Sequence, residues 1–153
     1  MLNAISGIIY TAVLAVVFAY WEVQIEGQHG HAAKLPCWRK EDGWIVKKIF
    51  GGTPITGYHI GMNLFLILAF HFVFIFTDWT FLKEVLIAGL IFEFLILEDF
   101  SWFLINPHYG FKRFKKEHIH WHRRWMGPVP SSYVYFGILA VILLTLGSQS
   151  LYL

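Results

Sequence analysis

The fold is decided by residues 54–105, PITGYHIGMNLFLILAFHFVFIFTDWTFLKEVLIAGLIFEFLILEDFSWFLI. This stretch holds two long apolar runs, residues 54–77 and 80–105, with Thr77–Thr80 as a tight connection between them. A helix that crosses a membrane needs roughly 20 mostly apolar residues, and both runs reach that length. We therefore predict two antiparallel membrane-spanning helices.

Similar apolar runs lie on either side of this pair, over residues 2–21 and 132–152. Of the 153 residues, 57% are apolar and only 14% are charged, too few charges to cover the surface of a soluble protein. We predict an all-α integral membrane protein in which residues 1–153 form one domain of four transmembrane helices. A soluble helical core is the alternative, and four such runs at this spacing argue against it.

Proline marks two of the predicted helix ends. Pro54 opens the second run, where its missing N–H costs nothing in a first helical turn. Asn106-Pro107 follows the third run, and the residue before a proline is pushed out of the helical conformation. The third helix is therefore predicted to end at Ile105.

Positive charge indicates the orientation of the four helices. Between the first and second runs lie Lys34, Arg39, Lys40, Lys47 and Lys48. Between the third and fourth runs lie Lys112, Arg113, Lys115, Lys116, Arg123 and Arg124. Two loops separated by two spans share one side of the membrane, and an excess of Lys and Arg favours the cytoplasmic side. We predict a protein of the cytoplasmic membrane with cytoplasmic basic loops and both termini outside.

The second basic loop also carries aromatic residues at helical spacing. Residues 110–126 place an apolar face opposite the cations, made of Phe111, Phe114, His118, Trp121 and Trp125. This pattern is typical of an amphipathic helix in the membrane interface, with its cations near anionic lipid headgroups. We therefore predict an interfacial helix over residues 110–126, bound to the lipid bilayer. The formal net charge of +2 gives no indication of a nucleic-acid partner.

Carboxylates and histidines gather at one depth near the cytoplasmic boundary. Glu22, Glu26 and His29 follow at i, i+4 and i+7, so a continuing helix places them on one stripe. His59 lies about 8 Å into the second span and Glu98 about 10 Å into the third, counted from the same side at 1.5 Å per residue. Glu-x-x-His spacing is used by helical bundles to hold iron or manganese. The alternative is that Glu22 and Glu26 are simply hydrated.

The HxHxH run of residues 118–122 adds further candidate ligands, because His118 and His122 lie one turn apart on a helix. The predicted metal ligands are Glu22, Glu26, His29, His59, Glu98, His118 and His122. Mixed carboxylate and imidazole ligands suit iron, manganese or zinc. Cys37 is the only cysteine, which excludes a thiolate-built site and an internal disulfide.

In its chemistry this arrangement resembles the membrane desaturases and hydroxylases, which hold two metal ions with histidine clusters at the cytoplasmic ends of helices. The resemblance covers only the HxHxH run of residues 118–122 and the ExxxExxH run of residues 22–29, and it indicates no family. It implies a metal-dependent enzyme acting on a lipid-like substrate.

Two other functions fit the same sequence. The chain would also serve as a non-catalytic subunit or anchor of a larger membrane complex. As a third alternative, Glu93 near the membrane midplane would belong to a small proton or cation transporter, which needs a homodimer to form a pathway. A hydrogen bond between Glu93 and Asn63 is the structural alternative for that acid, and His71 is expected to be a hydrogen-bonded packing residue.

Overall fold

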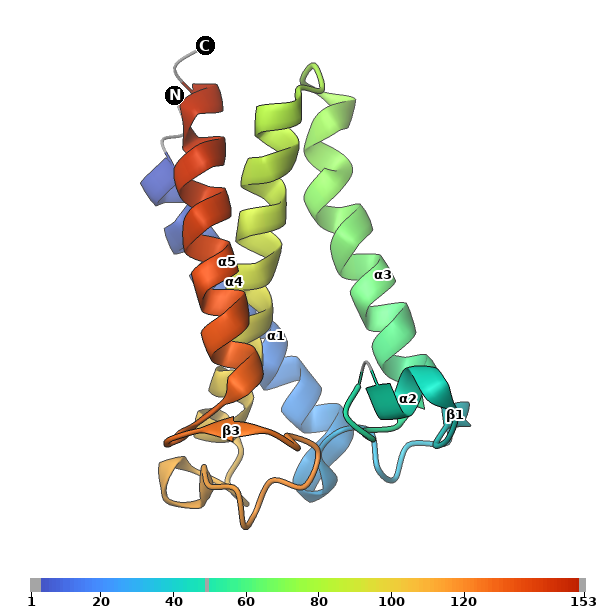
Figure 1. Ribbon diagram of the computed structural model, residues 1–153. Helices are drawn as coiled ribbons and strands as arrows, with labels where there is room; N and C mark the ends of the chain where they lie inside the picture. The colour runs from blue at the N-terminus through green and yellow to red at the C-terminus, as the bar shows by residue number, and fades with distance from the viewer. Residues whose placement is uncertain (1–3, 49, 152–153) are drawn as a thin grey trace.

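The computed structural model describes residues 4–48 and 50–151. Most of them are helical, as expected for the all-α class. The long helices, with the short 3₁₀ segments that extend them, are α1 (Ala4–Glu26) with η1 (Gly27–His29), α3 (Gly57–His71) with η2 (Phe72–Ile75), α4 (Phe81–Ile105), and α5 (Ser131–Gly147) with η4 (Ser148–Leu151). Figure 1 shows these helices with roughly aligned axes and alternating chain direction, with the α3–α4 connection at one end and the long loops at the other.

The loops at that second end contain only short elements. A five-residue helix, α2 (Trp44–Lys48), lies between β1 (Arg39–Lys40) and β2 (Ile55–Thr56), which pair antiparallel. A second pair joins β3 (Trp125–Met126) to β4 (Val129–Pro130). Because β2 runs directly into α3 and β4 into α5, the two pairs fix where these helices begin.

Helix α4 is the centre of the bundle, because it packs along its length against both α1 and α5. Glycine permits the close approach to α5. A Cβ at Gly89 would lie 2.9 Å from the backbone nitrogen of Leu144, and a Cβ at Gly147 would overlap the backbone of Leu86. Small residues at helix contacts are typical of membrane bundles, where van der Waals packing drives association. Helix α3 meets α4 over a shorter stretch.

Three helical segments of the described chain are long and apolar enough to cross a membrane: Ile5–His29, Gly57–Ile75 and Ser131–Ser150. Their outward faces are apolar, and Tyr10, Leu68 and Val141 are each more than 60% exposed. Large exposed apolar patches mark a surface that binds protein or lipid. These segments therefore indicate membrane association.

Helix α4 matches the length of the predicted third span but carries too much charge to be identified by composition alone. It contains five ionisable residues: Lys83, Glu84, Glu93, Glu98 and Asp99. The position of α4 between α1 and α5 keeps much of this helix away from the lipid-facing surface.

The predicted end of α4 agrees with the structure, but the predicted helix start at Pro54 is wrong. Helix α3 begins at Gly57, because Ile55 and Thr56 form a strand that pairs with Arg39 and Lys40. Helix α4 ends at Ile105, and Asn106 has the extended backbone that a following proline requires. Asn106 is 1% exposed, and its Nδ2 donates a 2.7 Å hydrogen bond to the carbonyl of Gly27. The ends of α1 and α4 that lie at the loop end of the bundle are thereby joined.

The predicted interfacial helix over residues 110–126 is wrong. The segment contains one 3₁₀ turn, η3 (Phe111–Arg113), and otherwise irregular backbone up to β3. The segment folds under the bundle, where Phe114 and Ile119 are buried in one core cluster with Phe103 of α4. These buried contacts outweigh the helical pattern, and the His-Ile-His-Trp-His stretch has only modest helix propensity. His118 is exposed, and Ile119 is buried in its place.

We predict that Gly147→Ala destabilises the packing of α5 on α4. The new methyl group would overlap the backbone of Leu86, which cannot rotate away, and overpacking of this kind costs about 1–3 kcal/mol. Thermal unfolding of the detergent-purified protein, followed by circular dichroism, measures the effect as a lower Tm. Gly137→Ala is the matched control, because its nearest neighbour would be Ile96 Cδ1 at 3.9 Å. Equal Tm values for both variants would contradict the close contact.

Candidate metal centre

Three predicted ligands meet at the loop end of the bundle. Glu22 and Glu26 lie one turn apart on α1, and His59 lies in the first turn of α3. One ligand atom from each lies within 4.8 Å of the other two, a spacing that could hold a metal ion. Glu22 and Glu26 are only 5% and 7% exposed, so both carboxylates are withdrawn from solvent.

The His59 ring is oriented by Thr56, the residue that caps α3. The Thr56 hydroxyl accepts a 3.2 Å hydrogen bond from the backbone N–H of His59. The same oxygen lies 2.6 Å from His59 Nδ1. Because Nδ1 is engaged, Nε2 is the ring nitrogen left for a ligand. Metal-binding histidines commonly hold their second nitrogen in this way, which fixes the ring and its tautomer.

Glu98 of α4 lies beside the cluster and adds a third carboxyl group. It is 5% exposed, and its carboxyl group faces that of Glu22 closely enough to interact with it. Within residues 4–48 and 50–151, Glu98 Oε1 has no hydrogen-bond partner. A buried acceptor without a partner costs about 1–3 kcal/mol, and a metal ion or a bound ligand would remove that cost.

The loop after α1 curls back onto Glu26. The Glu26 carboxylate accepts a short hydrogen bond from the backbone N–H of Ala32. His31 and Ala32 both have a φ of 52°, in the left-handed region that residues other than glycine rarely adopt. Arg39 stabilises this turn from the other side by donating to the carbonyl groups of Ala32 and Leu35.

This turn places His31 against His59. The two rings stack with centroids 4.4 Å apart, and His31 Nε2 donates to the carbonyl oxygen of Pro54 at 2.9 Å. Burial lowers the pKa of His31 below its ordinary value. The lowered pKa favours the neutral ring, which donates through Nε2 and stacks on His59.

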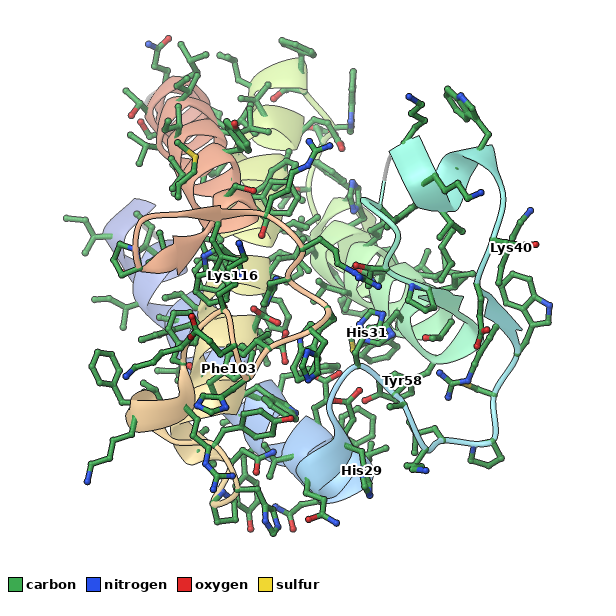
Figure 2. The ribbon with its side chains drawn as sticks, turned by 60° about the horizontal axis from the view of Figure 1, so that its bottom comes forward. His29, His31, Lys40, Tyr58, Phe103 and Lys116 are labelled. Atoms are coloured by element: carbon green, nitrogen blue, oxygen red, sulfur yellow. The ribbon has the colours of Figure 1, made fainter. Side chains whose placement is uncertain are left out.

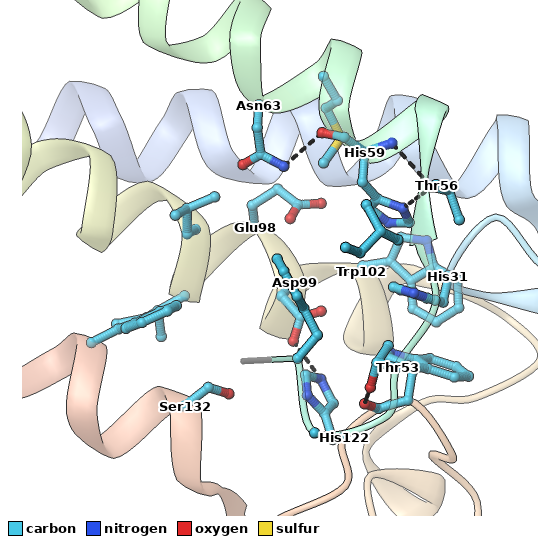
Figure 3. Close-up of a pocket in the computed structure, with 18 of the residues that line it drawn as sticks. His31, Thr53, Thr56, His59, Asn63, Glu98, Asp99, Trp102, His122 and Ser132 are labelled. Carbon is cyan, nitrogen blue, oxygen red and sulfur yellow. Dashed lines mark hydrogen bonds and ion pairs between the residues drawn. The ribbon is translucent and has the colours of Figure 1, made fainter. Parts of the chain in front are cut away.

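A second group of polar side chains adjoins the first. Asp99 Oδ2 is 2.9 Å from His122 Nε2 and also accepts a short hydrogen bond from the Tyr133 hydroxyl of α5. The backbone carbonyl of His122 accepts a 2.7 Å hydrogen bond from Trp125. Figure 3 shows Glu98 and Asp99 extending from α4 into the space between His59 and His122. The acids of α4 thus serve two different groups of side chains.

The structure does not bring all the predicted ligands together. Glu22, Glu26 and His59 form the cluster, and Glu98 adjoins it. His122 is bonded to Asp99 in the second group. His29 lies 3.5 Å from the side chain of Gln28 on an exposed part of η1. Figure 2, which looks at this end of the bundle, shows His31 near the middle and His29 near the edge.

His118, another predicted ligand, lies outside the cluster. It is exposed and lines a small surface hollow of about 180 Å³ together with Gln28, His108, Tyr109 and Arg113.

Several residues of the site carried no clear signal in the sequence. Thr56 lies within the predicted second span, but it is the N-cap of α3, and a Thr three residues before His59 has the spacing typical of a helix cap. Tyr133 is one of many aromatic residues in an apolar run. Asp99 adjoins Glu98, and ideal helix geometry points neighbouring residues to different faces. Both nevertheless line the same pocket.

Asn63 and His71, two polar residues deeper in the helices, form hydrogen bonds outside the cluster. Asn63 donates to the carbonyl oxygen of His59 at 2.7 Å and not to Glu93. His71 is hydrogen-bonded as expected, with Nδ1 2.7 Å from the carbonyl oxygen of Ile67 and Nε2 2.8 Å from Glu84.

A pocket of about 1010 Å³ opens beside the cluster of Glu22, Glu26 and His59. Its walls come from the loop end of α1, from α3, α4, the start of α5, and the loops around residues 50–56 and 121–124. The Glu22–Glu26–His59 cluster and the Asp99–His122–Tyr133 group both line this pocket. The cluster therefore adjoins a space with room for a ligand larger than a water molecule.

We predict that Thr56→Val weakens metal binding through His59. The variant loses the partner of His59 Nδ1, and loss of such an outer contact typically lowers metal affinity about 10–100-fold. Thr80→Val is the control, because Thr80 caps α4 in the same way, through the N–H of Lys83 at 3.3 Å, far from the cluster. Both variants should lose about 1 kcal/mol of stability. Titration with Zn²⁺, read by calorimetry, should separate them, and equal affinities would contradict the orienting role of Thr56.

The donor set consists of carboxylate oxygens and imidazole nitrogens. Such ligands suit iron, manganese and zinc, and they exclude the thiolate coordination that soft metals favour. A centre with three or four protein ligands and an adjoining pocket leaves coordination positions for a substrate or water.

No known protein family matches the chain, and no curated protein or solved structure matches it.

Proposed function

We propose that this chain is a metal-binding integral membrane protein whose Glu/His centre lies at the cytoplasmic boundary of the membrane and acts on a lipid-like substrate. Glu22, Glu26 and His59 bind the ion, and Glu98 supplies a further oxygen. The metal is iron, manganese or zinc. The observation that carries the proposal is the convergence of these three side chains within 4.8 Å in a buried place.

The electrostatics of the cluster favour a cation. Three carboxylates, those of Glu22, Glu26 and Glu98, are each less than 10% exposed. Removing carboxylates from water is expensive, and their mutual repulsion adds to that cost unless positive charge is close. A divalent ion supplies two positive charges and satisfies the free oxygen of Glu98. Structural packing of a subunit or anchor requires none of these features, since apolar residues would pack the same space at less cost.

We predict about one bound ion per chain in wild-type protein purified in detergent without chelators. Glu22→Gln and His59→Ala each remove a ligand and should reduce bound iron, manganese and zinc to background in elemental analysis. His118→Ala, an exposed histidine outside the cluster, is the control and should keep full loading. Wild-type protein without these metals, or equal loading of His59→Ala and His118→Ala, would rule out the centre.

We also propose that α4 crosses the membrane together with the three apolar segments, which makes four spans. The support is the short connection from α3 to α4 and the position of α4 between α1 and α5. With four spans, the positive-inside rule places the basic loops in the cytoplasm and the α3–α4 connection outside. The cationic loops then lie beside anionic lipid headgroups.

The sidedness predicts a labelling pattern. In a Cys37→Ser background, Asp78→Cys in the α3–α4 connection should react with a membrane-impermeant maleimide on intact cells. Lys116→Cys in the second basic loop should react only after the membrane is opened. Both positions are exposed, so the difference reports the side of the membrane and not burial. The reverse pattern would contradict the proposed orientation.

A further inference from the structure

The pocket beside the metal cluster has an apolar wall and a cationic rim, and the two lie at opposite ends of it. The apolar wall faces away from the loops and comes from three helices: Ile60, Leu64 and Ile67 of α3, Leu95 and Ile96 of α4, and Phe136 of α5. Among these, Leu64 is 56% and Ile67 is 45% exposed. The pocket therefore opens sideways along α3, toward the hydrocarbon of a surrounding membrane.

The rim at the loop end is positively charged. Arg123 and Arg124 both line the pocket where the second basic loop passes it. Arg123 donates only a long 3.4 Å hydrogen bond to the carbonyl of Gly52, and neither arginine forms an ion pair with a carboxylate within the described chain. Guanidinium groups without an acidic partner are well suited to a carboxylate or phosphate ligand.

Two buried polar atoms in the pocket wall also lack partners. Trp102 is 4% exposed and Glu98 5% exposed, and the two lie one turn apart on α4. Trp102 Nε1, a donor, and Glu98 Oε1, an acceptor, have no hydrogen-bond partner among the residues that the structure describes. Buried polar groups are nearly always paired, so an unpaired donor in the pocket wall indicates a ligand that offers an acceptor. An ester carbonyl between the headgroup and the acyl chain would accept from Trp102 Nε1, while Glu98 Oε1 stays available to the metal ion.

From these three features we propose that the pocket takes a membrane lipid with an acyl chain and an anionic headgroup. The chain enters from the bilayer between α3 and α5, and the headgroup binds Arg123 and Arg124. The polar linkage between them lies at Trp102, next to the metal cluster. This substrate class rests on the proposed metal function for its chemistry, but lipid binding is measured independently of the metal.

The order of the features along the pocket favours a lipid over a free anion. A small anion such as phosphate would use the rim alone and leave the apolar wall and the donor of Trp102 unoccupied. A lipid matches the three regions in the order in which they meet the membrane: hydrocarbon, interface and headgroup.

Native mass spectrometry of the detergent-purified protein tests the proposal with dioleoyl phosphatidylglycerol and dioleoyl phosphatidylcholine as probes. We expect the wild type to retain the anionic lipid on the order of tenfold more strongly. Arg123→Gln with Arg124→Gln should remove this preference. Lys115→Gln with Lys116→Gln, two exposed cations of the same loop that do not line the pocket, should leave it unchanged.

A second pair of variants tests the apolar wall. Ile67→Trp fills the pocket and should lower retention of both lipids, whereas Leu68→Trp lies on the exposed side of α3, outside the pocket, and should not. Equal retention of the two lipids by the wild type, or equal effects of the two tryptophans, would overturn the proposal. So would complete displacement of the lipid by inorganic phosphate, which would identify a free anion as the ligand.

Elemental analysis of the same samples separates this proposal from the metal centre. Selective retention of the anionic lipid without bound metal would support the lipid site and overturn the proposed function. Bound metal without a preference between the lipids would overturn the lipid site and leave the metal centre standing.

Discussion

The burial of like charges is the constraint on which the loop end of this protein depends. Glu26 is compensated by the backbone N–H of Ala32, and Asp99 by His122 and Tyr133. Glu22 and Glu98 face each other, both only 5% exposed, and the Tyr58 hydroxyl is a further neighbour of Glu22. Buried carboxylates in contact need protons or a cation between them. The surrounding fold supplies an imidazole at the same point, which is the combination that a metal centre requires.

Helix packing makes this concentration of polar groups tolerable. Helix α4 carries the acids, and the close approach of α5 at Gly89 and Gly147 places it inside the bundle. Its neighbour α1 contributes Glu22 and Glu26 from the facing side. Polar residues inside membranes are expensive and face the protein interior or a water-filled space. The apolar faces of α1, α3 and α5, by contrast, point outward.

The sequence was sufficient to predict the long helices and the end of α4, because apolar runs and Asn106-Pro107 act locally. It also indicated Glu22, Glu26, His59 and Glu98, since a common depth can be counted along a helix. It failed for residues 110–126, where burial of Phe114 and Ile119 beneath α4 overrode a helical pattern. The roles of Thr56, His31 and Tyr133 depend on loop conformation and side-chain contacts, which no periodicity encodes.

Helix α3 contacts α4 over only a short stretch. This limited contact couples the width of the proposed lateral opening to the geometry of the cluster. Helix α3 is joined to its neighbour at the short connection after η2, while its opposite end is tied mainly to loops, through Pro54 and Gly52. His59 is the only member of the three-residue cluster that α3 supplies. Any widening of the lateral opening therefore also lengthens the distance from imidazole to carboxylates. The proposed lateral opening and the proposed metal centre both depend on the position of this one helix.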